Sequence, residues 1–326
     1  MVEVKIEDLN YTLPTDEIDP YNFNKGEWLK NHPIDYFQLL YLLFRIPKEA
    51  SQVNNIPLDM ATDITFQELY ALTRLYIPDT LYKYVSFNDN LELNKKKILT
   101  LQNKKLFMAG VESFNDPFDC KAFFYDPRQL AHIERLKHID GEIIKDFSAY
   151  PKGIALTENN TNCMPMWAHY ANNHKGFCIS YNMRDPRNTS FRGCTFPIQY
   201  TDERLDITSF MKEYAETILG KLDDFLLQGG KRFVVSDLSI FYVPILLFNV
   251  KHLSWAYEKE FRCSIVHKQN DTPYIDAEPN AIFIGLNCDQ KYKSELINIA
   301  KQLSIPVYQM RFDKLSEQYA LKAEEC

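Results

Sequence analysis

The sequence predicts an α/β protein (α+β) with a mixed central sheet and flanking helices, preceded by a small helical domain. Two observations lead to this prediction. Strand-like and helix-like segments alternate from residue 81 onward, whereas residues 1–80 show helical patterns. We therefore expect a helical N-terminal domain over residues 1–80 and an α/β domain over residues 81–326.

Two helices are predicted in the N-terminal domain. Residues 36–44 are apolar on almost all sides, which suits a buried helix. Residues 65–76 repeat apolar groups at helical spacing, and Pro78-Asp79 then ends the helix because proline cannot continue it. The predicted domain boundary lies directly after this stop.

The α/β domain opens with a strand and a helix. Residues 81–85 form a short aromatic and β-branched run, which favours a strand. A turn or helix cap at 88–90 precedes apolar residues at helical spacing up to Leu101, and residues 105–110 return to a strand pattern. The loop at 113–119 is rich in turn formers.

The same alternation continues to the end of the chain. Three further strands are predicted at residues 153–157, 177–181 and 260–266, and a short helix is predicted at residues 165–171. The segment 206–252 is mostly helical in pattern, with an interruption at Gly229-Gly230. A final strand, helix and strand are predicted at residues 281–286, 291–303 and 307–312.

Composition and charge favour a cytoplasmic protein that binds no membrane. The formal net charge of -7 gives no overall field that attracts nucleic acid, which leaves only a local basic groove for such binding. No apolar segment of a signal peptide follows Met1, and the longest apolar run, 242–250, contains Pro244 and Asn249. The 7 cysteines include no C-x-x-C pair, which suits a reducing compartment.

The first candidate site is the charged segment 255–262. An extended backbone would send Glu258, Glu260 and Arg262 to one face of a strand. Two carboxylates beside a guanidinium influence each other's ionisation, and such a group can stabilise positive charge on a substrate or accept a proton. The alternative is a charged strand face with a weak ion pair.

The second candidate site is the aromatic segment 166–176. Helical spacing places Trp167, Tyr170 and His174 on one stripe, which suits stacking against a flat ring such as nicotinamide or adenine. Aromatic stripes of this kind are also typical of a hydrophobic core. The histidines and cysteines of this region match no standard zinc spacing, so we predict no metal site.

The third candidate site is the loop 113–119. Its Phe114, Asn115 and Asp116 precede a proline, and ordinary turn chemistry explains such a sequence. Asp116 and Asp119 could also bind a metal ion together with the acids of the charged segment, although no spacing rule supports this. The chain has no P-loop and no G-x-G-x-x-G motif.

Taken in order, four segments resemble a large bacterial family known as a domain of unknown function. They are LYKY at 81–84, SFNDPFD at 113–119, MWAHYANNHKG at 166–176 and YEKEFR at 257–262. The resemblance covers roughly residues 81–315. The helical N-terminus lies outside it.

That family in turn resembles ADP-ribosyltransferases that modify DNA or remove a 2′-phosphate from RNA. Those enzymes open with a strand carrying Leu-Tyr-His and a helix beginning Asn-Leu, and here Leu81-Tyr82-Lys83 and Asn90-Leu91 stand in the same order. Their catalytic glutamate on a late strand resembles Glu260, with Glu258 as the companion acid. Lys83 departs from the usual histidine or arginine, and an ammonium group does not reproduce an imidazole or a guanidinium fork.

The resemblance implies an NAD-dependent effector of the toxin or phage-defence type that modifies a macromolecular acceptor, either nucleic acid or protein. Cleavage of the nicotinamide–ribose bond places positive charge on the ribose, which Glu260 would stabilise. Glu258 would orient the acceptor nucleophile or a ribose hydroxyl, and His169 is the third candidate catalytic residue. The candidate NAD-binding residues are Lys83, Tyr84, Phe114, Asn115, Asp116, Trp167, Tyr170, His174 and Arg262.

Two other functions fit the same residues. A metal-dependent nuclease or phosphohydrolase would bring Asp116 and Asp119 within coordination distance of the two glutamates. A non-catalytic module for nucleotide binding or protein interaction would have Glu260 neutralised by Arg262. The sequence carries no indication of the oligomeric state or of the role of residues 1–80.

Overall fold

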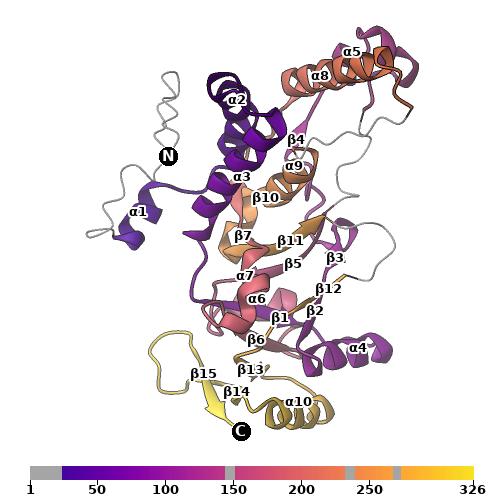
Figure 1. The fold of residues 1–326 in the computed structure, drawn as a ribbon. Coiled ribbons are helices and arrows are strands. Elements are labelled where there is room, and N and C mark those ends of the chain that lie inside the picture. Colours follow the sequence, from indigo (N-terminus) through magenta and orange to yellow (C-terminus); the bar gives the residue numbers. More distant parts are fainter. Residues whose placement is uncertain (1–23, 144–150, 232–238, 267–272) are drawn as a thin grey trace. The chain divides into compact units, whose positions relative to one another are not determined.

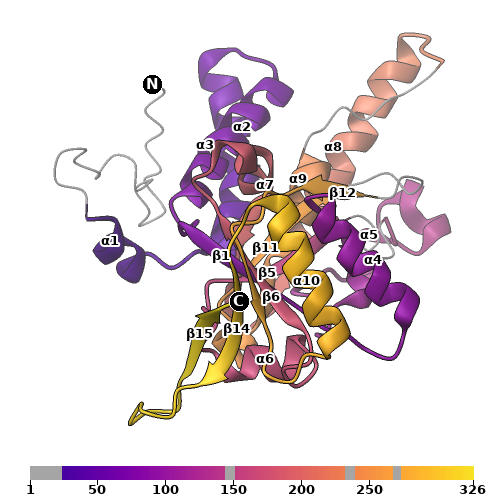
Figure 2. The same ribbon diagram turned by 90° about the horizontal axis from the view of Figure 1, so that it is seen from below.

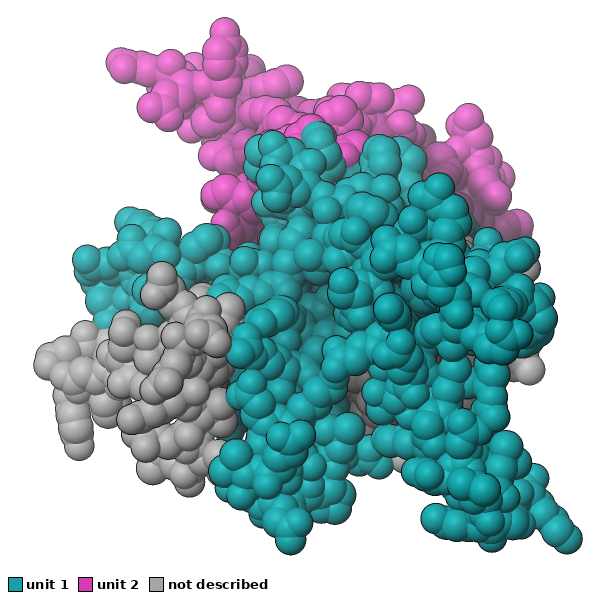
Figure 3. Space-filling view, turned by 90° about the horizontal axis from the view of Figure 1, so that it is seen from above, with its two compact units in different colours: residues 1–76, 111–151, 199–253 teal, residues 77–110, 152–198, 254–326 magenta. Residues whose placement is uncertain are grey.

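The computed structural model describes residues 24–143, 151–231, 239–266 and 273–326 (Figure 1; Figure 2 gives the view from below). The chain forms two compact units, coloured separately in Figure 3. Unit 1 consists of residues 1–76, 111–151 and 199–253. Unit 2 consists of residues 77–110, 152–198 and 254–326. The unit that holds the N-terminal helices is therefore assembled from three stretches of sequence. Residues 1–23 of the predicted N-terminal domain lie outside the described residues.

Unit 1 is mainly helical. Its helices are α1 (Lys25–Asn31), α2 (Tyr36–Asn54), α3 (Leu58–Arg74), α5 (Pro127–Leu130), α8 (Thr208–Leu227) and α9 (Ser239–Phe248), with the 3-10 turns η1 (Val111–Ser113) and η2 (Glu134–Ile139). Two short parallel strand pairs join β4 (Phe123–Phe124) to β9 (Leu205–Asp206) and β8 (Gln199–Thr201) to β10 (Val250–His252). The two predicted N-terminal helices are confirmed as parts of α2 and α3, although α3 ends at Arg74.

The helices of unit 1 begin and pack as their sequences indicate. Asp35 caps α2, because its side chain accepts a hydrogen bond of 3.1 Å from the backbone N–H of Gln38. The buried side chains of α2 include Leu39, Leu40 and Leu43, which explains why this segment is apolar on most sides. The apolar run of the sequence around residues 242–250 falls in α9 and β10, and no helix in the described part of the chain is long and apolar enough to span a bilayer.

Unit 2 is built around a sheet of nine strands, the largest in the part of the chain that the structure describes. The strands of unit 2 are β1 (Thr80–Val85), β2 (Lys105–Phe107), β3 (Ala109–Gly110), β5 (Pro151–Thr157), β6 (Phe177–Asn182), β7 (Thr195–Pro197), β11 (Glu260–Val266), β12 (Tyr274–Asp276), β13 (Ala281–Ile284), β14 (Val307–Phe312) and β15 (Leu321–Glu325). Its helices and 3-10 turns are α4 (Leu91–Gln102), α6 (Met164–Tyr170), α7 (Thr189–Gly193), α10 (Gln290–Leu303), η4 (Pro186–Asn188) and η5 (Leu253–Glu258).

The sheet of unit 2 is mixed, as predicted. Its order is β15-β14-β13-β6-β1-β5-β11-β7, with β3 paired to β5. The pair β13–β14 is parallel, whereas the pairs β1–β6, β6–β13 and β7–β11 are antiparallel. The central position of β1 and the neighbouring β5 and β11 bring together the segments that carry the candidate residues of unit 2.

Helices cover both faces of this sheet. Alternation along β6 sends Phe177 and Ile179 into a core shared with α4 and α10, which lie side by side in Figure 2. Cys178 points to the opposite face and packs with Met166 and Trp167 of α6. The prediction of flanking helices is therefore confirmed.

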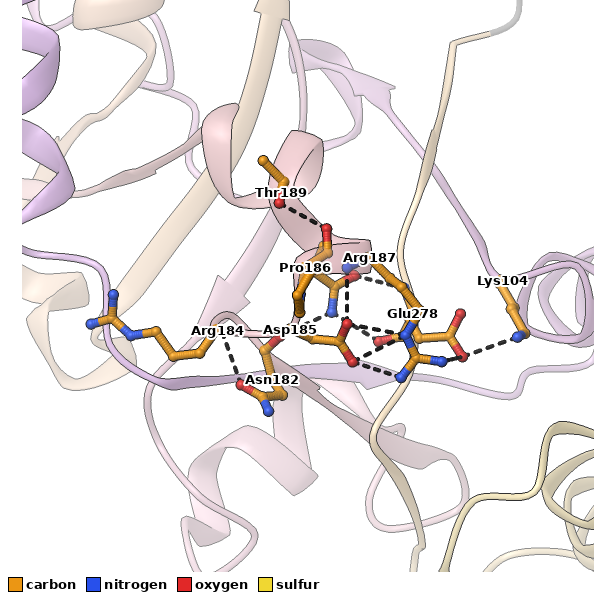
Figure 4. Close-up of polar contacts among 9 residues, drawn as sticks. Lys104, Asn182, Arg184, Asp185, Pro186, Arg187, Thr189 and Glu278 are labelled. Carbon is orange, nitrogen blue, oxygen red and sulfur yellow. Dashed lines mark hydrogen bonds and ion pairs between the residues drawn. The ribbon is translucent and has the colours of Figure 1, made fainter.

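The buried Asn188 and the neighbouring Glu278 join two parts of unit 2; Figure 4 shows Glu278 between Arg187 and Lys104. The side-chain N–H groups of Asn188 donate to the carbonyls of Asn182 and Glu278 at 3.0 and 3.1 Å, and its oxygen accepts from the N–H of Glu278 at 2.7 Å. The carboxylate of Glu278 also pairs with Arg187 and Lys104, each at 3.0 Å. This network fixes the connection that leads into β13, outside the candidate site.

Candidate functional site

The charged segment 255–262 is not one extended strand. The turn η5 ends at Glu258, and β11 begins only at Glu260. Between them, Lys259 has a φ of 45°, in the left-handed region, so the chain changes direction at this residue. The prediction that one extended backbone directs all three charged side chains to one face is therefore wrong. Strand alternation relates Glu260 to Arg262, whereas Glu258 belongs to the preceding turn.

The end of β5 and the residues after it hold this turn in place. The hydroxyl of Thr157 donates to the carbonyl oxygen of Glu258 at 2.6 Å. The side-chain N–H groups of Asn159 donate to the carbonyl oxygens of Tyr257 and Glu258 at 2.7 and 3.0 Å. These bonds tie the backbone of η5 at Tyr257 and Glu258 to the end of β5 and the residues after it.

Glu260 and Arg262 form a buried ion pair. The guanidinium Nε of Arg262 donates to Oε1 of Glu260 at 2.7 Å, and the side chains are 0% and 3% exposed, respectively. Burying two charges costs several kcal/mol of desolvation, which such a pair recovers only in part. A hydrophobic pair of similar size would often serve stability equally well, so this pair is a candidate for a functional role.

Glu258 has a different partner. The hydroxyl of Tyr170, at the last residue of α6, donates to Oε1 of Glu258. The Glu258 residue is only 2% exposed, whereas Tyr170 is half-buried. Two buried acids separated by one residue thus have different surroundings, one beside a guanidinium and one beside a phenol. Such differences separate the chemical roles of neighbouring carboxyl groups.

Lys83 lies on the central strand β1 with its ammonium group withdrawn from solvent. Its Nζ donates to the carbonyl oxygen of Ala155 on β5 at 3.0 Å. Burial lowers the pKa of Lys83 to about 8, against the opposing charge of Glu260 and with a smaller lowering effect from Lys97. A lysine of this kind exchanges its proton near physiological pH, which an arginine at the same position would not do.

The aromatic residues of α6 do not form one stripe. Trp167 is fully buried, donates from Nε1 to the carbonyl of Thr161 at 2.8 Å, and meets Tyr84 edge to face with centroids 5.0 Å apart. His174 stacks on Trp167 at 5.7 Å, but α6 has already ended at Tyr170. The single helical stripe was therefore a wrong prediction. Tyr170 is directed to Glu258, while Trp167 and Tyr84 belong to the core below α6.

The turn after α6 is held in an unusual conformation. Asn172, Asn173 and His174 all have left-handed backbones, with φ values of 48°, 53° and 67°. The side chain of Asn172 donates to the carbonyl of Phe87 at 2.6 Å, and the N–H of Asn287 donates to the carbonyl of His174 at 2.9 Å. Asparagine tolerates the left-handed conformation, and these hydrogen bonds hold the turn that leads from α6 into β6.

The imidazole of His174 combines burial with an unused hydrogen-bonding atom. Its Nδ1 is buried and has no hydrogen-bond partner among the described residues. Burial also lowers the pKa of His174, which favours the neutral ring at neutral pH. Among the described residues, stacking on Trp167 and not a hydrogen bond to Nδ1 holds the ring in place.

Comparison with known proteins identifies one part of the chain. Residues 166–263 match the model of a family described as "Protein of unknown function (DUF2971)". This segment is similar to DUF2971. No curated protein and no solved structure matches the chain. The match supports the predicted resemblance to a domain-of-unknown-function family. Its bounds include α6 from Met166 onward, the left-handed turn, Glu258 of η5 and Glu260 of β11.

The loop that carries Phe114, Asn115 and Asp116 lies outside the DUF2971 segment and in unit 1. Phe114 packs edge to face on Phe248 with centroids 5.3 Å apart. Asp116 is buried; one carboxylate oxygen accepts from the N–H of Phe118 at 2.9 Å, and the other has no hydrogen-bond partner among the described residues. The remaining candidate residues belong to unit 2, where Lys83 pairs in register with Ile179 on the side of α4 and α10, and Tyr84 and Trp167 lie on the side of α6; the three loop residues belong to unit 1.

No metal centre is seen in the described ranges. No group of three or more His, Cys, Asp or Glu side chains is arranged there to hold an ion. The nuclease alternative requires Asp116 and Asp119 to converge with the glutamates, and these two acids belong to unit 1.

Two aromatic residues of the DUF2971 segment escape the sequence prediction. Trp255 and Tyr257 lie on η5, with ring centroids 6.3 Å apart. Tyr257 is 6.3 Å from the exposed His169, which is 6.5 Å from Tyr170. We call these four residues the aromatic ledge. Their only signal in the sequence is the presence of two large rings directly before the acids.

Proposed function

We propose that unit 2 binds NAD and cleaves its nicotinamide–ribose bond in the manner of an ADP-ribosyltransferase. The observation that supports this proposal best is the pair of buried acids, Glu258 and Glu260, each held by a specific partner at the turn into β11. A sheet face that needed only stability would gain more from apolar side chains at these positions. Buried and mutually close ionisable groups are characteristic of catalytic sites.

Glu260 is the proposed catalytic residue, and it would act as a carboxylate. A carboxylate beside the ribose stabilises the positive charge that develops as the glycosidic bond breaks. Arg262 fixes the direction of this carboxylate, because its Nε donates to Oε1 of Glu260 at 2.7 Å. In this proposal Arg262 is a positioning residue, and it does not touch the reacting atoms.

The other residues of unit 2 would bind and orient. Glu258 would accept a hydrogen bond from a ribose hydroxyl or from the acceptor. This bond would replace the one that the hydroxyl of Tyr170 donates to Glu258. Lys83 would meet negative charge on the dinucleotide in its protonated form. His174 would line the α6 side of the site, where its ring stacks on Trp167. These three side chains would supply an acceptor, a positive charge and a flat ring to a dinucleotide.

A toxin or phage-defence effector is the proposed setting. Removal of nicotinamide from NAD or modification of a macromolecule disables a cell, and the resemblance to DNA-modifying transferases supports this reading. The proposed location is the cytoplasm, where NAD and macromolecular acceptors are both present.

The test is an incubation of the full chain with NAD labelled in its adenine half, together with a bacterial cell extract. The wild-type protein should release nicotinamide and transfer label to protein or nucleic acid. Glu260→Gln should lower the rate by roughly 10²- to 10³-fold, because it removes the charge and keeps the size. Glu158→Gln is the matched control, since Glu158 is an exposed acid directly after β5, paired with Lys259 at 3.5 Å. Equal rates for Glu260→Gln and wild type would refute the proposal.

One observation favours a second candidate function, a non-catalytic nucleotide-binding or interaction module. The Glu260 carboxylate is already neutralised by Arg262 and excluded from solvent, as such a module predicts. In that case NAD is not cleaved, and Glu260→Gln leaves the cellular phenotype unchanged. Arg262→Lys separates the two candidates further. An enzyme loses rate because a lysine cannot fix the carboxylate in the same direction, whereas a binding module without catalysis has no rate to lose.

A further inference from the structure

The last strand of unit 2, β15, lies at one edge of the nine-stranded sheet. It pairs with β14 on one side, and Figure 2 shows these two strands next to each other. Within the part of the chain that the structure describes, no strand pairs with the other side of β15. Residues 322–325 are all exposed, and the strand contains neither proline nor glycine. An edge of this kind offers backbone donors and acceptors to a further strand.

The hydrogen bonds at the two ends of the β14–β15 pair fix the direction of the backbone groups. The N–H of Asp313 donates to the carbonyl of Ala320, and the N–H of Cys326 donates to the carbonyl of Val307, both at 3.0 Å. In an antiparallel pair, every second residue of a strand directs its N–H and C=O groups toward the neighbouring strand. From Ala320 to Cys326, the even-numbered residues of β15 therefore face β14.

The odd-numbered residues of β15 face outward. The backbone groups of Leu321, Ala323 and Glu325 point away from β14, as the alternation requires. Leu321 shows this directly, because its N–H donates to Oδ1 of Asn162 at 2.7 Å and not to β14. Since Asn162 takes this donor at one end, the accessible part of the edge is centred on Ala323.

The charges of β15 are self-complementary in one register. When two copies of an edge strand pair antiparallel, a two-fold axis relates them and passes beside one residue of each copy. An axis at Ala323 places Lys322 of each copy opposite Glu324 of the other, at a position where opposing side chains lie close together. An axis at Lys322 or at Glu324 would instead place like charges opposite each other. The charges therefore select the axis at Ala323.

The contacts of these charges within the chain leave them accessible to a second copy. Lys322 lies 2.8 Å from Glu324, and Arg311 lies 3.3 Å from the other carboxylate oxygen of Glu324. The side chains of Lys322 and Glu324 are 50% and 45% exposed, so these pairs are solvated and exchange easily. Each carboxylate oxygen accepts more than one hydrogen bond, which allows Glu324 to bind Lys322 of a second copy as well.

We propose that β15 is a dimerisation edge, at which two copies of this chain pair antiparallel about Ala323 and join their sheets. Each Ala323 N–H donates to the Ala323 carbonyl of the other copy, and each Glu325 N–H donates to the Leu321 carbonyl of the other copy. Because the paired segment is short, the dimer is weak and its population depends on protein concentration. The proposal goes beyond the proposed function and does not depend on NAD.

The test is sedimentation velocity of the full chain at concentrations up to about 1 mM. The buffer contains a reducing agent, so that the exposed Cys326 cannot cross-link two copies. The wild type should pass from monomer to dimer as the concentration rises. Glu324→Lys turns both symmetry-related pairs from attractive to repulsive and should raise the dissociation constant of the dimer roughly 10- to 100-fold.

Charge exchange provides the rescue. The double variant Lys322→Glu, Glu324→Lys again places unlike charges opposite each other and should recover most of the dimerisation that Glu324→Lys loses. Lys301→Glu is the matched control, because it reverses a charge at an exposed position of α10 and should leave the dissociation constant unchanged.

A proline at the axis tests the backbone pairing separately. The N–H of Ala323 points away from β14, so Ala323→Pro removes no hydrogen bond within the chain but removes the two bonds at the axis. This variant should melt at the temperature of the wild type and remain monomeric. The inference would be overturned by a wild type that stays monomeric at about 1 mM, by dimerisation of Glu324→Lys or folded Ala323→Pro that equals the wild type, or by a double variant that shows no rescue. None of these results bears on NAD cleavage, which is tested independently.

Discussion

Lys83 is expected to cost the protein stability at neutral pH. Its pKa is lowered from 10.5 to about 8, because the ammonium group is buried. A difference of about 2.5 units between the unfolded and folded states corresponds to about 3 kcal/mol. Lys83→Met keeps the length of the side chain and removes the charge. We therefore expect Lys83→Met to be more stable than the wild type at pH 7, by up to about 3 kcal/mol.

The sign of the effect follows from proton binding. Below pH 8 the lysine is protonated in both states, and the folded state carries the full cost of the buried charge. Between pH 8 and pH 10.5 the unfolded chain binds more protons than the folded protein, so the stability of the wild type rises with pH. Above pH 10.5 the lysine is neutral in both states. The advantage of the methionine variant should therefore shrink by about 3 kcal/mol between pH 7 and pH 10.5.

The assay is urea unfolding of both proteins at a series of pH values, with the difference in free energy of unfolding plotted against pH. Taking the difference cancels the other groups that titrate in this range. Lys96→Met is the matched control, since Lys96 is exposed on α4 and its substitution should give a difference that does not change with pH. A flat difference curve for Lys83→Met would refute the reasoning, because it would mean that Lys83 titrates as an exposed lysine does.

Three further predictions test the framework of unit 2. Asn188→Ala removes three hydrogen bonds from a fully buried side chain and should lower the free energy of unfolding by about 3 kcal/mol in a urea titration. Gly176→Ala should cost about 3 kcal/mol or more, because its Cβ would lie 1.9 Å from the carbonyl oxygen of Val85, whereas Gly220→Ala in α8 meets no atom within 4 Å and should stabilise by about 0.5–1 kcal/mol. Burial lowers the pKa of His174 below 6.5, so the stability that the neutral ring contributes is present above pH 6.5 and is lost as the pH falls through the folded pKa. Thermal melts between pH 7 and pH 5 should therefore show a smaller fall in melting temperature for His174→Asn than for the wild type.

Local elements of unit 2 are largely predictable because their signals are local. The alternation of apolar residues from Glu260 to Val266 indicates β11, and the aromatic and β-branched run at 81–85 indicates β1. Proline near the start of α6 marks the beginning of that helix. In each case the residues that carry the signal are also the residues that form the element.

The backbone at the candidate acids gives no such signal. Lysine rarely adopts a left-handed conformation, so nothing at Lys259 announces the turn that separates Glu258 from Glu260. By contrast, Asn172 and Asn173 are residues that tolerate this conformation, and the early end of α6 could be read from them. The hydroxyl of Tyr170 reaches Glu258 across 88 residues of sequence, which only the folded chain reveals.

Contacts between residues that are far apart in sequence determine which segments form unit 1. The backbone N–H of Tyr36 at the start of α2 donates to the side chain of Gln199, 163 residues later, and α2 also packs against α9. Such contacts depend on the shapes of side chains and on single hydrogen bonds, which the spacing of apolar residues along the sequence does not reveal. A boundary near residue 80 is therefore visible in the sequence, but the return of the chain to unit 1 at residues 111 and 199 is not.

Hydrogen exchange with and without NAD tests the central claim most directly. Amides of α6, the left-handed turn and the start of β11 should exchange more slowly when NAD is present, because the ligand would contact Tyr170, His174 and Glu260. The helices α2 and α3 of unit 1 should not change and serve as an internal reference. No protection anywhere at saturating NAD, or protection confined to unit 1, would contradict the assignment of the dinucleotide site to unit 2.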